Sequence, residues 1–106
     1  PDPKMVEGAR VCGADRVELY TAAYAENFKS DPQKAVEPYR KAAETARECG
    51  LGLNAGHDLN LDNLSFFIKT IPGTDEVSIG HALICDALYM GLEKTIWSYL
   101  EQIQNF

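Results

Sequence analysis

The chain has 106 residues, of which 45% are hydrophobic and 25% charged, and its formal net charge is −6 at pH 7. This composition is typical of one globular unit, and the acidic excess disfavours binding to nucleic acid or to an anionic membrane surface. The sequence contains no apolar run near the roughly 20 residues that cross a bilayer, and no secretory signal pattern. We therefore expect a cytoplasmic protein with neither a membrane nor a nucleic-acid partner.

The three cysteines, Cys12, Cys49 and Cys85, are widely separated and form no C-x-x-C pair. This spacing favours neither a disulfide framework nor a zinc site, so we expect buried structural thiols and no bound metal. The first residue is Pro1, and the opening segment already has a helical pattern. The sequence therefore suggests a fragment or a trimmed chain.

The first element is predicted to be a helix, with Asp2 as its N-cap, Pro3 in its first turn and Gly13 at its end. The β-prone run 15–21 follows as a strand. A second helix is expected over 32–49, where apolar residues recur at three- and four-residue steps and Gly50 marks the end. Because proline disrupts helix interiors, Pro38 predicts either a kink or a true start near Glu37.

Residues 51–56 then form a second short apolar strand, followed by an amphipathic helix over 61–70. A third strand is predicted over 76–80. The rest of the chain, 81–106, has a helical pattern that Met90 and Gly91 divide into a short and a longer helix.

Three short strands separated by helices predict α/β units with parallel strands. A doubly wound sheet of flavodoxin type needs about five strands and a closed (β/α)₈ barrel roughly 250 residues, so either architecture would be incomplete here. The last unit favours the barrel, because a strand that ends in Gly80-His81 before a short helix is typical of a barrel phosphate site. We expect the C-terminal portion of a TIM barrel, with about three β/α units in 1–106.

Polar residues stand at comparable places in the three units. Glu18 lies within the first strand, His57 follows the second, and Gly80 and His81 follow the third. Parallel strands present their carboxyl ends on one rim, where ligands bind. A carboxylate and a histidine can perform acid–base chemistry, and N–H groups at a glycine before a helix can hold an anion.

Each of these polar residues also has a simpler, structural interpretation. Glu18 could point outward from an edge strand and pair with a lysine. His57 and His81 could cap helices or bond to carbonyls. Asp58 and Asp62 could be helix-start residues.

The segments "RVELYTAAYA", "LGLNAGHDLNLDNL" and "VSIGHALICDALYMGLEKTI", in this order, closely resemble the C-terminal part of the pyridoxine 5′-phosphate synthase family. The resemblance covers nearly the whole chain. It implies a (β/α)₈ barrel of which this chain supplies the fifth helix and then strands six to eight with their helices. It also implies a homo-oligomer and no cofactor or metal.

By this resemblance, the substrates would be 1-deoxy-D-xylulose 5-phosphate and 3-amino-2-oxopropyl phosphate, which condense to pyridoxine 5′-phosphate. Glu18 would stabilise cationic intermediates and His57 would donate a proton. Asp58, Gly80 and His81 would contact phosphate. Asp58 departs from the glycine that is usual at its position, so its contact would have to be made by the backbone.

Other catalytic residues of the family belong to the first half of the barrel, so the chain alone is expected to be inactive. Two rival functions remain. One is a non-catalytic α/β module that binds a phosphorylated ligand or a protein. The other is another phosphate-binding barrel enzyme, such as an aldolase or isomerase, which would usually carry a lysine or a second carboxylate at these strand ends.

Overall fold

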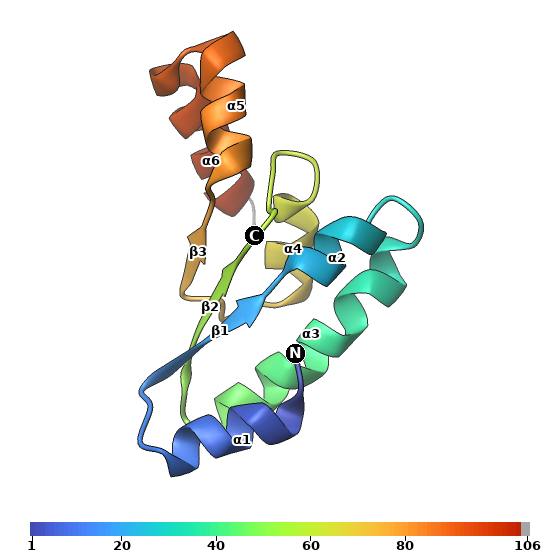
Figure 1. Ribbon diagram of the computed structural model, residues 1–106, viewed down its shortest axis with the longest axis vertical. Helices are drawn as coiled ribbons and strands as arrows, with labels where there is room; N and C mark the ends of the chain where they lie inside the picture. The colour runs from blue at the N-terminus through green and yellow to red at the C-terminus, as the bar shows by residue number, and fades with distance from the viewer. Residues whose placement is uncertain (105–106) are drawn as a thin grey trace.

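The computed structural model describes residues 1–104, which form an α/β structure built on one parallel sheet. The sheet has the order β1-β2-β3, from β1 (Arg16–Tyr20), β2 (Gly52–Gly56) and β3 (Glu76–Ser78). Figure 1 shows α1, α2, α3 and α4 beside the strands and a helical hairpin, α5–α6, beyond the carboxyl end of β3. The helices span Pro3–Val11 (α1), Ala22–Asn27 (α2), Pro32–Glu48 (α3), Leu64–Thr70 (α4), His81–Met90 (α5) and Leu92–Gln104 (α6).

The first two predicted helices form as the sequence indicates. The side chain of Asp2 accepts a hydrogen bond from the Lys4 amide at the start of α1, and the side chain of Asp31 accepts one from the Lys34 amide at the start of α3. Helix α3 is continuous across Pro38, so a true start near Glu37 was wrong. Capping at Asp31 and burial of one face of α3 outweigh the hydrogen bond that Pro38 removes.

Two local features differ from the predicted elements. Helix α2 was not predicted, because its six residues are too few for a periodic pattern; it forms around Tyr24, which is fully buried. Helix α4 begins at Leu64 rather than at residue 61, with Asn63 as its N-cap residue. The three residues before it form a turn in which the Asn60 side chain accepts hydrogen bonds from the amides of Asp62 and Asn63. The helix-start interpretation of Asp58 and Asp62 was therefore wrong.

The predicted division of the last helical segment is confirmed. Gly91 has a φ of +87°, a left-handed conformation that favours glycine, and it separates α5 from α6. Of the predicted apolar side of α6, Tyr99 is buried, whereas Leu92 and Ile96 are exposed. Residues 105–106, which the sequence also assigns to this helix, lie outside the described residues.

The two faces of the sheet have different environments. Leu19, Leu53 and Ala55 point to the helix side, where they join a core that includes Tyr39 and Phe67. The opposite face presents the alternate residues of each strand, because side chains alternate along a strand. This second face, here called the polar face, carries Arg16, Glu18, Tyr20, Gly52, Asn54, Gly56, Glu76 and Ser78.

The cysteines are free, as predicted, but their expected burial was wrong. Cys12 and Cys85 are exposed, and Cys49 is half-buried. Cys12 follows the exposed end of α1, and Cys85 lies on α5, a helix without a buried residue. Among residues 1–104, no helix has the length and apolar character that a bilayer crossing requires.

Candidate functional site

A cleft of about 560 Å³ lies at the carboxyl ends of the three strands. It is lined by residues from β1, from the segment that follows β2, and from the junction of β3 with α5. All five residues that the sequence singled out border this one cleft: Glu18, His57, Asp58, Gly80 and His81. The structure thus brings together residues that are up to 63 positions apart in the chain.

Glu18 lies on the polar face, with its carboxylate over the neighbouring strand. A Cβ atom built on Gly56 would lie only 2.6 Å from Glu18 Oε1 and 3.2 Å from the Cβ of Ser78. Gly56 therefore leaves the space that the carboxylate occupies. Glu18 is exposed on the edge strand β1, as the simpler interpretation expected, but within residues 1–104 no lysine pairs with it, and its carboxylate lies over Gly56 and lines the cleft.

The backbone of His57 adopts an uncommon conformation, with a φ of +107°. Two hydrogen bonds from Thr21 secure the end of β2 at this point. The Thr21 amide donates to the carbonyl of Gly56 at 2.9 Å, and the Thr21 hydroxyl donates to the carbonyl of His57 at 2.6 Å. Since Thr21 is fully buried, it fixes the direction in which His57 leaves the strand.

The imidazole of His57 lies between a phenol and a carboxylate. Its Nε2 is 3.3 Å from the hydroxyl of Tyr20, and the two ring centroids are 4.5 Å apart. Its Nδ1 is 3.0 Å from Oδ2 of Asp58. The side chain remains about half exposed, so it can reach a bound molecule. The ring is thus accessible from the cleft and hydrogen-bonded at both nitrogens, an arrangement compatible with proton transfer.

Asp58 also has a positive φ, of +59°, in the left-handed region that glycine adopts without strain. The Asn63 side-chain amide donates to the Asp58 carbonyl and supports the turn.

Gly80 and His81 lie where β3 leads into α5, with Gly80 as the N-cap residue and His81 as the first helical residue. A second hollow of about 670 Å³ adjoins the first and shares Asp58, Gly80 and His81 with it. Unpaired N–H groups and the helix dipole favour an anion at such a place. The start of α5 is therefore the candidate anion site of this region.

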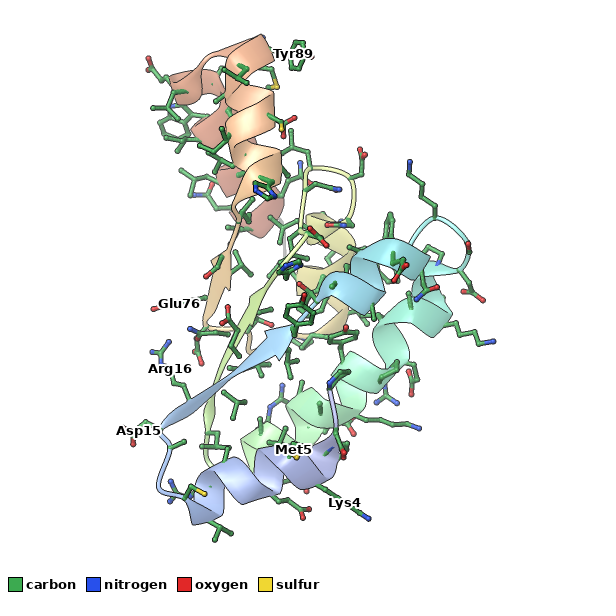
Figure 2. The ribbon with its side chains drawn as sticks, viewed as in Figure 1. Lys4, Met5, Asp15, Arg16, Glu76 and Tyr89 are labelled. Atoms are coloured by element: carbon green, nitrogen blue, oxygen red, sulfur yellow. The ribbon has the colours of Figure 1, made fainter. Side chains whose placement is uncertain are left out.

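The polar face also carries a charged network at the amino ends of the strands. Arg16 donates to the Asn54 side chain at 3.1 Å and forms an ion pair with Glu76 at 3.4 Å. Figure 2 shows Arg16 and Glu76 close together, although their strands, β1 and β3, have β2 between them. The network provides a second carboxylate, that of Glu76, on the polar face but outside the cleft lining.

Three residues of this region were not singled out from the sequence. Tyr20 and Ser78 line the cleft, and Thr21 holds the backbone of His57. Strand alternation could have identified Tyr20, because it stands two positions after Glu18 on the same face. Among residues 1–104, no group of three or more His, Cys, Asp or Glu side chains is arranged to hold a metal ion.

Comparison with known proteins identifies relatives along almost the whole chain. Residues 1–105 match the family of the pyridoxal phosphate biosynthesis protein PdxJ. The pyridoxine 5′-phosphate synthase of Bacteroides thetaiotaomicron is 63% identical over 98 residues, which are 92% of this chain and 41% of that protein. The synthase of Cytophaga hutchinsonii is 59% identical over 105 residues, 99% of this chain and 44% of that protein. The chain thus spans less than half the length of these relatives, and it belongs to the PdxJ family.

Proposed function

We propose that these residues form the last three β/α units of a (β/α)₈ barrel and the C-terminal part of a pyridoxine 5′-phosphate synthase. The parallel sheet, with helices on one face and a polar face opposite, supports this architecture, because a barrel encloses one face of its sheet. In this arrangement the polar face is the barrel interior. Cytoplasmic location and homo-oligomeric assembly remain predictions.

The observation that carries the functional proposal is the convergence of Glu18, His57, Gly80 and His81 on one cleft. The reaction joins 1-deoxy-D-xylulose 5-phosphate to 3-amino-2-oxopropyl phosphate and releases phosphate and water. It requires a fixed negative charge for cationic intermediates, a proton donor for the departing groups, and anion sites for the substrate phosphates.

Each requirement has a candidate in the cleft. The Glu18 carboxylate is positioned by the space above Gly56 and supplies the negative charge. His57, beside Tyr20 and Asp58, supplies the proton. The N–H groups of Gly80 and His81 hold a phosphate at the start of α5. A backbone contact from Asp58 to phosphate also remains a prediction.

The chain does not contain the residues that would come from the first five units, so we expect it to be inactive alone. The test is reconstitution of the completed barrel, defined here as this chain joined to the N-terminal part of the Bacteroides thetaiotaomicron synthase. The completed barrel should form pyridoxine 5′-phosphate from the two substrates, and the separate chain should not.

Two results would contradict the proposal. One is a folded completed barrel that forms no product. The other is steady product formation by the 106-residue chain alone. A compact monomer of the separate chain that binds phosphate, together with an inactive completed barrel, would favour the non-catalytic module instead.

A further inference from the structure

We propose that Asp58 is a positioning residue for His57: its carboxylate keeps the proton of the neutral imidazole on Nδ1, so that Nε2 is the nitrogen that takes up a proton and then, from the imidazolium, donates it in the cleft. This inference rests on the proposed function for its kinetic consequence. The state of the imidazole itself can be measured without any assay of activity.

The first support is the placement of the carboxylate. Asp58 Oδ2 lies 3.0 Å from His57 Nδ1, and no other carboxylate within residues 1–104 lies this close to the His57 ring. An ionised carboxylate accepts hydrogen bonds and cannot donate them. It therefore favours the tautomer whose proton is on Nδ1 and disfavours the one that presents a lone pair there.

The second support is that Tyr20, the other residue in contact with the ring, does not favour either tautomer. The Tyr20 hydroxyl, 3.3 Å from Nε2, can donate to a bare nitrogen or accept from a protonated one. Glu18 and His81 are the remaining titratable groups that line the cleft. Asp58 is thus the neighbour that distinguishes the two ring nitrogens.

The third support is the backbone conformation, which holds the side chains of His57 and Asp58 next to each other. The φ values of +107° at His57 and +59° at Asp58 turn the two residues out of the strand. The hydrogen bonds from Thr21 to the His57 carbonyl and from Asn63 to the Asp58 carbonyl hold this turn. Aspartate accepts a left-handed conformation better than most residues, and unlike glycine it adds a carboxylate.

The test compares Asp58→Gly with the unchanged completed barrel. Glycine adopts the same backbone conformation without strain and removes the side chain with its carboxylate. Two-bond ¹H–¹⁵N spectra of the histidines, with His57→Asn to assign the signal, distinguish Nδ1–H from Nε2–H. We expect Nδ1–H to predominate in the unchanged protein and Nε2–H to gain in the glycine variant. The kcat should fall about three- to tenfold with little change in KM, since the pair is half exposed.

Asp62→Asn is the matched control. It removes one negative charge from the same loop, where Asp62 is exposed, and should change neither the spectrum nor kcat. An Asp58→Gly variant with an unchanged tautomer, or with an unchanged kcat, overturns the proposal. A lower KM with an unchanged tautomer also overturns it, because Asp58 would then act by repelling the substrate phosphate. If the unchanged completed barrel has no activity, the proposed function fails, while the spectra still decide the position of the proton.

Discussion

The carboxylate of Glu18 occupies the space that a side chain on Gly56 would need, with 2.6 Å between Oε1 and the position of that Cβ. Residues on two neighbouring strands thus constrain one another, since Glu18 lies two positions before Tyr20, the register partner of Gly56, on the same face of β1. The placement of the acid depends on the absence of a side chain across from it.

Gly56→Ala is expected to displace the Glu18 carboxylate rather than unfold the protein, because the flexible end of a side chain can move. In the completed barrel, kcat should fall by about tenfold or more, since sub-ångström placement matters in a preorganised site. Gly8→Ala is the control. Gly8 lies in α1 with open space around it, and alanine there should raise the free energy of unfolding by about 0.5–1 kcal/mol without changing kcat. Equal activity of both variants would contradict the role of the Gly56 space.

Glu18→Gln should remove the charge that stabilises cationic intermediates while keeping the shape of the side chain. We expect a loss of at least about 100-fold in kcat in the completed barrel. Glu76→Gln removes a carboxylate from the same polar face, in the Arg16 network, and should change kcat less than about threefold. Steady-state kinetics of the two variants test the assignment, which is wrong if Glu76→Gln is the more damaging change.

The buried tyrosines predict a loss of stability at alkaline pH. Burial raises the pKa of both Tyr24 and Tyr39 above the usual value of 10.0. The folded chain therefore keeps protons that the unfolded chain releases, so the free energy of unfolding should fall as the pH rises above about 10. Urea denaturation between pH 8 and pH 11 measures this dependence. A flat profile across that range would contradict it.

Tyr24→Phe separates the two effects of that side chain. The Tyr24 hydroxyl donates to the carbonyl of Asn63, so its removal should cost about 1–2 kcal/mol at neutral pH. The same change should reduce the loss of stability above pH 10, because one ionisable group is gone. Tyr89→Phe is the control, since Tyr89 is 92% exposed at the end of the hairpin, where Figure 2 shows it pointing away from the sheet. Tyr89→Phe should change neither the free energy of unfolding at neutral pH nor its decrease above pH 10.

The sequence predicted the fold well where a periodic pattern was long enough. The cap at Asp2 and the break at Gly91 are local signals, and each appears as expected. Helix α2 was not predicted because six residues around Tyr24 show no period. The prediction that the cysteines are buried was wrong, because exposure depends on which helix faces other elements cover, and neighbouring residues in the sequence do not reveal this.

The rim residues were predictable because parallel strands share a direction, so Glu18, His57 and His81 had to approach one edge. The pairing of Asp58 with His57 could not be predicted. It depends on two consecutive residues with positive φ, a conformation for which glycine is the usual signal and which here falls on a histidine and an aspartate. Likewise, the role of Thr21 depends on where β1 ends relative to β2.

The most direct test of the account is a crystal structure of the completed barrel with pyridoxine 5′-phosphate bound. We predict a phosphate oxygen within about 3 Å of the backbone nitrogen of Gly80 or His81, with Glu18 and His57 facing the pyridine ring. A product molecule bound elsewhere, or a barrel in which Glu18 and His57 point away from it, would contradict the account.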